Sequence, residues 1–421
     1  MPLRRFASMG RLRVPILRFA VCFDAIRGAV PVTILYHNSR FFLIFASVMK
    51  RLAVIVLVLF QCFVAGAQYF PAKEGDGALL KGVKKTLNFL TRPKKYIDST
   101  YLWAAPPELR VRTSNSLQRT GMVLDWDFKS DGYKPESLKS DYLGGLKNKV
   151  GFKVSYAKIS LGLSFEVDKN KKWHKRNASF GYKSGPWVIS ADYLKIKDVL
   201  SDDMPDTYCV SKHYTLDVFY GFNRRRFAYD AAFGRSIVQR RSAGSFMLAA
   251  RLLHGKSTFD KNDYLMSLIG NVSGYSSYQG LLGVGYSYNL VFWHKDPQPV
   301  TYRAWNSNAR QGLRNFTLSV TLIPFLTAYS YVMTVPFSSE EGGASSSRVR
   351  TITNKPQLNY IGRASLGFNF NRFSFGLRFI YDRSLFNFIH SPKNDNEDLY
   401  DIHWKGHLSI KTFSTYIILY L

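Results

Sequence analysis

Two aspartates are the side chains in this sequence that are best spaced for acid–base chemistry. Asp217 lies in the run YTLDVFYGF and Asp230 in the run RFAYDAAFG, and apolar residues recur at every second position in both runs. If Phe222 pairs with Phe227 in a hairpin, the two carboxylates become diagonal neighbours on one face, with Cα atoms about 7–8 Å apart. Carboxylates this close can separate their pKa values and act as acid and base.

The same two carboxylates can instead belong to a salt-bridge network, for which Arg251 and Arg378 are available partners. Catalytic signatures are missing from the sequence. It has no G-x-S-x-G or H-E-x-x-H motif, and GKS at 255–257 lacks the first glycine of a phosphate-binding loop because Ala250 stands there. We therefore favour the network, expect that the protein is not an enzyme, and predict no catalytic residues, no metal site and no cofactor.

A second group of candidate residues is the basic run RSIVQRRSAGS, which contains Arg235, Arg240 and Arg241. Guanidinium groups next to a turn can bind lipid phosphates or acidic sugars through charge-assisted hydrogen bonds. The alternative is a rim of arginines whose stems cover apolar surface while their charged groups stay in water. We favour the rim and keep the anionic lipid or glycan contact as the second reading.

The N-terminal region has the pattern of an export signal. Met49, Lys50 and Arg51 precede the apolar run LAVIVLVLFQCFV, and AGA ends at residue 67. This predicts a signal peptide at 49–67, an over-called start at 1–48, and a periplasmic or plug-like segment at 68–116. A membrane anchor through the same region would place two cations inside its span, which is unfavourable by several kcal/mol.

Composition narrows the class of partner. The chain has 421 residues and a formal net charge of +29, of which residues 68–421 retain +21. Such a charge can indicate nucleic acid, but an exported chain seldom meets it, so outer-membrane lipid and lipopolysaccharide are the predicted partners. Only Cys209 lies beyond the predicted signal peptide, which excludes an internal disulfide framework there.

The elements that must position these residues are β-strands. In LGFNFNRFSFGLRFIYDRS (366–384), aromatic and aliphatic residues occupy one face at a period of two, and Ser, Gly, Asn and charged residues occupy the other. A two-residue loop at 371–372 pairs Phe370 with Phe373 and Phe368 with Phe375. FKVSYAK and ISLGLSFEV repeat this plan around a turn at 157–158.

About a dozen such runs follow one another, and long connections alternate with short ones. A soluble sandwich also alternates, but the polar face here is too hydrophilic for a dry core, and the apolar face is rich in the aromatic residues of membrane girdles. We predict an all-β transmembrane antiparallel up-and-down β-barrel of about 12 strands, within a range of 10–14, over residues 117–421. The short turns should face the periplasm.

Three short segments resemble known proteins. The terminal run FSTYIILYL resembles the assembly signal of outer-membrane barrels, although Leu421 stands where Phe is more usual. YIDSTYL (96–102) and FGRSIVQRRSAGSF (233–246) resemble an uncharacterised family of Gram-negative barrel proteins, domain of unknown function 4421, over roughly residues 95–421. The resemblance implies the cell outer membrane and the barrel assembly machinery as a partner, and it brings no known activity.

We therefore expect an outer-membrane barrel of the Gram-negative envelope that is structural or acts as a passive or lipid-handling conduit. The alternatives are a barrel-embedded hydrolase that uses the two carboxylates and a fatty-acid-type transporter with an N-terminal plug. The sequence leaves the oligomeric state open.

Overall fold

The protein is described here from a computed structural model. The structure describes residues 97–421 apart from 106–107, 130–136, 145, 168–172, 202–207, 232–236, 260–271, 298–309, 337–347, 351–356 and 392–400. All of them belong to the second of two units, Leu90–Leu421. The predicted over-called start, the signal peptide and residues 68–96 of the predicted N-terminal segment lie outside the described residues. No helix among the described residues is both long and apolar enough to cross a membrane.

The described chain is almost entirely β-structure, with one short 3₁₀ helix, η2 (Tyr229–Ala231). The strands are β1 (Leu102–Ala104), β2 (Leu109–Lys129), β3 (Ser137–Gly144), β4 (Lys147–Tyr156), β5 (Ile159–Val167), β6 (Trp173–Ser184), β7 (Trp187–Ser201), β8 (Tyr208–Gly221), β9 (Ile237–Gln239), β10 (Ala243–Phe259), β11 (Val272–Lys295), β12 (Arg314–Pro336), β13 (Arg348–Arg350), β14 (Leu358–Phe370), β15 (Phe373–Ser391) and β16 (Asp401–Tyr420).

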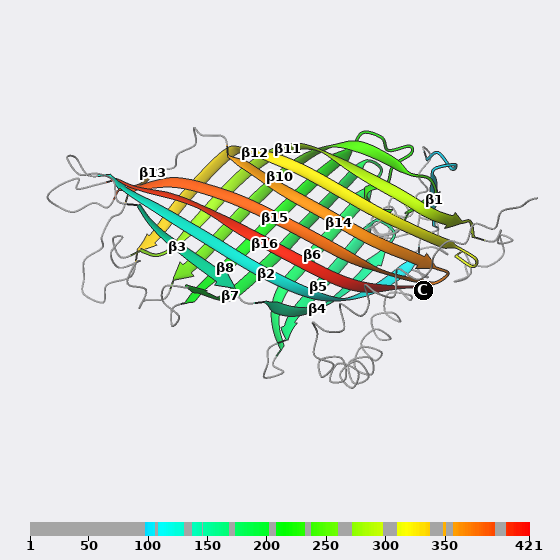
Figure 1. Ribbon diagram of the computed structural model, residues 1–421, viewed down its shortest axis with the longest axis horizontal. Helices are drawn as coiled ribbons and strands as arrows, with labels where there is room; N and C mark the ends of the chain where they lie inside the picture. The colour runs from blue at the N-terminus through cyan, green and yellow to red at the C-terminus, as the bar shows by residue number, and fades with distance from the viewer. Residues whose placement is uncertain are drawn as a thin grey trace, which may run out of the picture. The chain divides into compact units, whose positions relative to one another are not determined.

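Fourteen of these strands form one antiparallel sheet that closes on itself, because β16 pairs with β15 on one side and with β2 on the other. All of them except the short strands β3 and β13 take part in the ring, so the barrel has twelve strands (Figure 1). The predicted transmembrane antiparallel barrel of about 12 strands is therefore confirmed. β2 begins at Leu109, earlier than residue 117, where we placed the start of the barrel.

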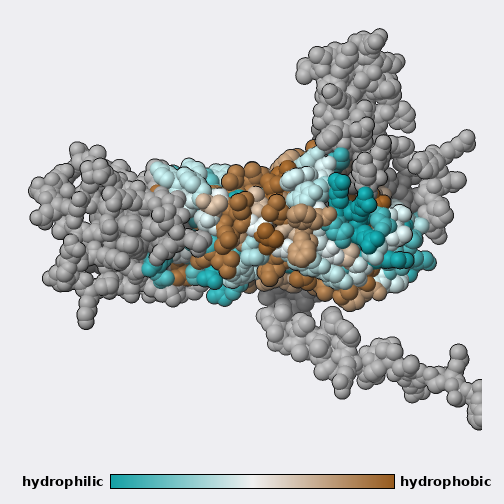
Figure 2. All heavy atoms as spheres, turned by 90° about the horizontal axis from the view of Figure 1, so that it is seen from above, coloured by the Kyte–Doolittle hydropathy of each residue, from teal (hydrophilic) through white to brown (hydrophobic). Residues whose placement is uncertain are grey.

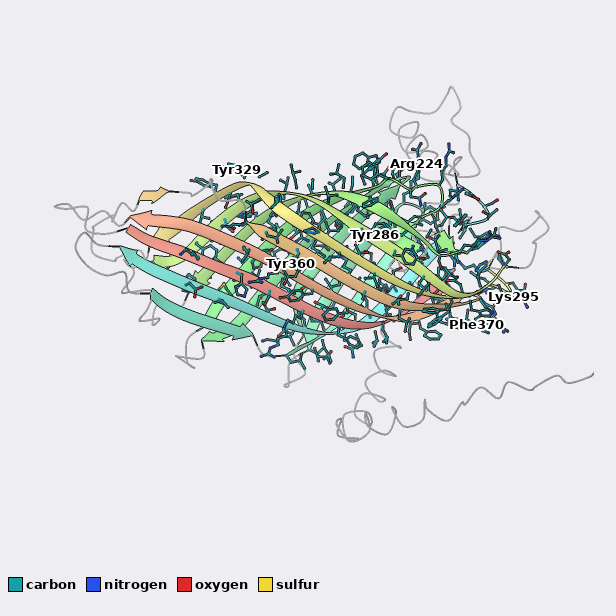
Figure 3. All side chains as sticks on the ribbon, turned by 45° about the horizontal axis from the view of Figure 1, so that its top comes forward. Arg224, Tyr286, Lys295, Tyr329, Tyr360 and Phe370 are labelled. Carbon is teal, nitrogen blue, oxygen red and sulfur yellow. The ribbon has the colours of Figure 1, made fainter. Side chains whose placement is uncertain are left out.

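The β14–β15 hairpin has the predicted register. Phe370 pairs with Phe373 and Phe368 with Phe375, and Asn371 in the turn has a φ of 49°. Asn tolerates this left-handed conformation better than most residues, which suits it to a two-residue loop. We call this end of the barrel, with turns at 157–158, 185–186 and 371–372, the short-turn end, and the opposite end the long-loop end. Figure 3 labels Phe370 at the short-turn end.

The outward face of the barrel carries an apolar band. Figure 2 shows hydrophobic residues gathered across the middle of the visible face, with hydrophilic residues toward both ends. Exposed aliphatic side chains contribute to the band: Leu216, Leu248, Leu252, Leu282, Val284, Val320 and Leu322. A surface of this extent is unfavourable in water and matches the hydrocarbon of a bilayer.

Aromatic rings border the band on both sides. Toward the long-loop end, Tyr193, Tyr214, His254, Tyr278 and Tyr331 follow one another over five adjacent strands. Their successive ring centroids are 5.0, 5.6, 4.2 and 6.3 Å apart. Toward the short-turn end, Phe292, Phe316, Phe368 and Phe375 form a second row, with centroids 5.1, 6.2 and 5.0 Å apart. Two such girdles are typical of membrane barrels.

The wall branches in one place. The part of β2 nearer the short-turn end pairs with β4, whereas its other half pairs with β3, which in turn pairs with β7. At the long-loop end, β3 alone therefore takes the place that β4, β5 and β6 fill at the short-turn end. The short-turn end of the wall therefore contains more strands than the long-loop end on this side.

One predicted hairpin was wrong. RFAYDAAFG is not a strand: the connection after β8 runs on to residue 242, and β8 pairs with β10. Elsewhere, β6 and β7 meet at the turn containing Gly185 (φ 59°), and β12 is one continuous strand.

Candidate functional site

The two motif segments meet inside the short-turn end of the barrel. Leu102 in β1 pairs with Gln239 in β9, and Ala104 pairs with Ile237, which makes a small two-stranded sheet separate from the wall. We call residues 97–104 together with the described part of 222–242 the plug. Its contacts, described next, are with side chains that face the lumen, so it occupies the interior of the barrel at this end.

Gln239 holds the polar part of the plug together. Its side chain is 1% exposed, and its Nε2 donates to the carbonyls of Arg226 (2.6 Å) and Arg241 (2.9 Å). Two wall residues complete the set: Asn289 Nδ2 donates to Gln239 Oε1 (3.1 Å), and Asn315 Nδ2 donates to the Gln239 carbonyl (2.8 Å). A buried amide whose groups are satisfied in this way fixes the plug against β11 and β12.

Ion pairs and hydrogen bonds hold the rim of the plug in place. Asp98 lies 3.4 Å from Arg226, and it accepts hydrogen bonds from the hydroxyl (2.6 Å) and backbone N–H (3.0 Å) of Thr100. These two bonds, followed by the Arg226 charge, hold the pKa of Asp98 below its usual value, against the opposing effect of desolvation. Arg240 forms a 2.7 Å ion pair with Asp296 and also donates to the carbonyl of Ser99.

An apolar cluster fills the lumen beneath the plug. Tyr229 and Phe227 from the plug pack against lumen-facing residues of β8, β10, β11, β12 and β14, which are Phe219, Met247, Ala249, Leu281, Ile323, Phe325 and Ile361. Met247 and Ile323 are 0% exposed. The prediction that the inward face is uniformly Gly, Ser, Thr, Asn and charge is therefore wrong on this side, where large apolar side chains meet the plug.

Asp217 lies in a buried ion network next to this cluster. Arg251 donates to both of its carboxylate oxygens, from Nε to Oδ1 at 2.6 Å and from Nη2 to Oδ2 at 3.0 Å, and Arg251 Nη1 reaches Asp382 at 2.8 Å. Arg363 stands 3.6 Å from Asp217 and donates to the Tyr229 hydroxyl at 2.7 Å. The network thus ties four wall strands to the plug.

The hairpin that would join Asp217 to Asp230 does not form. Phe222 N–H donates to the carbonyl of Phe246, not to Phe227, and the chain turns inward after Asn223. Asp230 lies in η2, and its side chain is outside the described part of the structure. The Asp217 carboxylate faces Arg251, one of the two partners that the sequence suggested.

The three arginines of the basic run have different positions. Arg235 lies outside the described residues. Arg240 is turned toward Ser99 and Asp296 at the rim of the plug, and Arg241 is exposed. Among the described side chains of this run, Arg241 is therefore the one open to solvent, while Arg240 helps to attach the plug.

The opposite side of the lumen is basic and contains a cavity. Arg110 and Arg112 on β2, Lys153 on β4 and Lys183 on β6 face inward there, on the strands next to the branch in the wall. The cavity of about 40 Å³ is lined by Arg110, Arg112, Lys153, Ser155, Ala157, Lys158, Ile159, Ser160, Lys183 and Ile418. We call this surface the basic sector.

Sequence reasoning missed the basic sector, although each of its residues stands on the polar face of a predictable strand. Lys153 is visible as a polar position in FKVSYAK. Its proximity to Arg112 depends on the pairing of β2 with β4 in a register that sets Arg112 opposite Lys153. The sequence does show cations at lumen-facing positions of strands that are 40 to 70 residues apart in the chain. They could be placed together only once the pairing register of these strands was known.

Residues 96–295 match the family model described as Domain of unknown function (DUF4421). No curated protein matches the sequence. The match ends with β11, whereas our resemblance extended to residue 421, so β12–β16 of the same barrel lie beyond it.

Solved structures with a similar backbone fold include membrane barrels. The outer membrane protease OmpT from Escherichia coli matches at 9% identity and a TM-score of 0.35, over 77% of this chain and 100% of that one. The translocator domain of autotransporter NalP from Neisseria meningitidis matches at 8% identity and 0.26, over 79% and 96%. The toluene transporter TodX from P. putida matches at 7% and 0.17, over 74% and 90%.

Values this low carry no information on activity, so the family match and the described geometry are the basis for identification. The matched region begins at the first residue of YIDSTYL and contains both motif segments, which pair as β1 and β9 in the plug. Residues 96–295 of this transmembrane barrel, just under half of the chain, therefore match the DUF4421 family model.

Proposed function

We propose that this protein is a non-catalytic, plugged conduit of the Gram-negative outer membrane. The observation that carries the proposal is the plug itself. It is fixed by hydrogen bonds between Gln239 and two wall residues, Asn289 and Asn315, and it fills one side of a lumen whose other side is polar. A barrel with only a structural role has no need of a separate, hydrogen-bonded segment in its lumen.

The hydrolase alternative has less support. A carboxylate pair for acid–base work needs two oxygens that are free to take up and release a proton. Both oxygens of Asp217 accept hydrogen bonds from Arg251, and Arg363 lies nearby. The Asp217 carboxylate is thus engaged by arginine at both oxygens. The network is better suited to holding the wall and the plug together.

The proposal includes the predicted location and partners. Export through a cleaved signal peptide, insertion by the barrel assembly machinery and contact with lipopolysaccharide are expectations from the sequence. The apolar band with two aromatic girdles supports them because it fits a bilayer. The fatty-acid-type transporter is less favoured, since the polar side of the lumen is lined by cations and small polar residues rather than by a continuous apolar path.

Conductance in planar lipid bilayers tests the conduit. The wild-type protein should be mostly closed, and Gln239→Ala should raise its open probability by about tenfold or more, because several hydrogen bonds worth about 0.5–1.5 kcal/mol each are lost. Gln279→Ala is the matched control. This lumen-facing amide is also buried, but it donates to the carbonyl of Leu385, in the wall strand β15.

The control variant should conduct as rarely as the wild type. Heat-modifiable gel migration checks that all three proteins are folded. A folded Gln239→Ala variant that is as silent as the wild type would favour a purely structural role for the barrel.

A further inference from the structure

The cavity in the basic sector is lined by an unusually high share of positively charged residues. Five of its ten lining residues are Lys or Arg, and none is acidic. They come from β2, β4, β5, β6, β16 and the turn at 157–158, so the register of the sheet brings them together at the short-turn end. Concentrating like charges in a partly desolvated space is unfavourable unless an opposite charge offsets it.

Several cations of the cavity are held in defined positions. Arg110 Nη2 donates to the carbonyl of Ala157 at 3.0 Å, and the Arg112 guanidinium lies 4.3 Å from the centre of the Tyr416 ring. Both arginines are less than 9% exposed. Their charges are therefore fixed by the fold before any ligand arrives, which lowers the entropy lost on binding.

Two glycines, on β5 and β6, leave room for the side chain of Lys153 to lie across the sheet. A Cβ atom added at Gly162 would lie 3.5 Å from Cβ and Cγ of Lys153 and 2.5 Å from Ser179 Oγ. One added at Gly181 would lie 3.9 Å from Lys153 Nζ. The lysine stem thus runs over one glycine toward the next, and its ammonium group is directed along the lumen face toward β6.

The charges around Lys153 are mostly of its own sign. Its strongest electrostatic neighbours are the cations Lys183, Arg112 and Arg378, together with one carboxylate, Asp192. An anion of more than one negative charge would relieve this repulsion better than a single carboxylate.

The size of the cavity fits a compact oxyanion. A space of about 40 Å³ exceeds the roughly 10–15 Å³ that one water molecule needs by about threefold. A tetrahedral anion fills such a space and presents oxygens on all sides to donors that come from different strands. Arginine and lysine are the usual phosphate ligands in proteins.

We propose that this cavity binds a phosphate group, with Arg112, Lys153 and Lys183 as its principal ligands. The group belongs either to a free phosphate or soluble phosphomonoester, or to the headgroup of an anionic lipid. The site does not depend on conduction through the barrel, because it lies in the wall opposite the cluster that seals the plug.

Isothermal titration of the full chain in phosphate-free detergent solution tests the proposal with three probes. These are inorganic phosphate, glycerol 3-phosphate, and mixed micelles containing phosphatidic acid, with phosphatidylcholine micelles as the blank. Binding of inorganic phosphate or glycerol 3-phosphate assigns a soluble source, and binding of phosphatidic acid alone assigns a lipid source. Binding of none of the probes overturns the proposal.

Charge-matched variants locate the site. Lys153→Gln and Lys183→Gln should each weaken the binding of the active probe by about tenfold or more, because a charge-assisted hydrogen bond is worth about 1.5–3 kcal/mol. Lys256→Gln removes the same charge from an exposed position on β10 and should change binding less than about twofold.

Gel migration shows whether each lysine variant is folded. If one of the two does not fold, the other still tests the position of the binding site. Binding that is unchanged in the folded variants places the anion elsewhere and overturns the assignment.

Discussion

The two sides of the lumen differ in the side chains that fill them. Along β8–β14 the inward positions carry large apolar residues and an ion network, and the plug packs on them. Along β2–β6 they carry Gly, Ser and a group of cations around a cavity. Two aspartates show the contrast: Asp217 on β8 is 2% exposed, whereas Asp192, on the adjacent strand β7, is exposed.

This difference shows that barrel alternation fixes which face points inward but not what fills the inside. The larger part of the plug arises from the connection between β8 and β10, so it folds back onto the wall strands next to its own origin. Those strands supply apolar side chains to meet it. On the far side, no described segment packs in this way, and the cavity of the basic sector lies there.

The largest expected effect is on the side of the lumen on which the plug packs (β8–β14). Asp217→Asn removes the carboxylate that Arg251 contacts at two oxygens and should lower the free energy of unfolding by about 3 kcal/mol, since breaking a buried ion pair is strongly destabilising and Arg251 then keeps Asp382 as its ion-pair partner. Urea unfolding in lipid vesicles, followed by tryptophan fluorescence, measures the change. Asp192→Asn on the adjacent strand β7 is the comparison. This carboxylate also interacts electrostatically with Lys153, Arg251 and Arg363, but its side chain is exposed, so its removal should cost less than that of Asp217. Equal losses in the two variants would contradict the contrast between the sides.

The next prediction sharpens the difference between the lipid face and the open lumen. Leu377 is exposed on the outward face of β15, and its neighbour Arg378 points inward, toward Lys153. Leu377→Arg should destabilise the barrel by about 2–4 kcal/mol because a guanidinium must enter hydrocarbon. Arg378→Leu removes one of several like charges and should cost less. The folded fraction in vesicles over a denaturant series, with gel migration as marker, decides between them. A mature chain that folds as a monomer in plain buffer would rule out the lipid-facing assignment.

The smallest effect concerns the rim of the plug and depends on pH. The folded-state pKa of Asp98 lies below its unfolded value of about 3.9, so its contribution to stability is present above that value and is lost as pH falls through the folded pKa. The wild type should therefore melt slightly above Asp98→Asn at pH 7, and the difference should shrink as the pH falls below about 4. A difference that is equally large at pH 7 and pH 3 would assign the effect to packing rather than to the charge.

Local hairpins were predictable from the sequence, and long-range placement was not. Phe368 and Phe375 were paired correctly because a short turn and a strict period of two leave only one register that keeps the apolar face continuous. The same rule failed for Phe222 and Phe227. The segment after Asn223 has alternating residues but folds inward, and β10, which is long enough to span the wall, takes the place beside β8.

The basic sector shows a second limit. The polarity of Lys153 and Arg112 was visible, but their convergence follows from β2 being paired with β4 on one side and with β16 on the other. Closure joins the first and last wall strands, and no local pattern encodes their relative register. We predicted a periplasmic or plug-like segment only at 68–116, whereas residues 222–242 of the plug come from the middle of the chain.

The segment 222–242 enters the lumen from β8 and returns to β10, so it is anchored at both of its ends to adjacent strands of the wall. This part of the plug stays attached to the barrel when it is displaced, because both of its ends continue into wall strands. Once displaced, it faces its docking site at an effective concentration on the order of millimolar. Reclosure is then an intramolecular event, and the barrel can seal itself again without a partner protein.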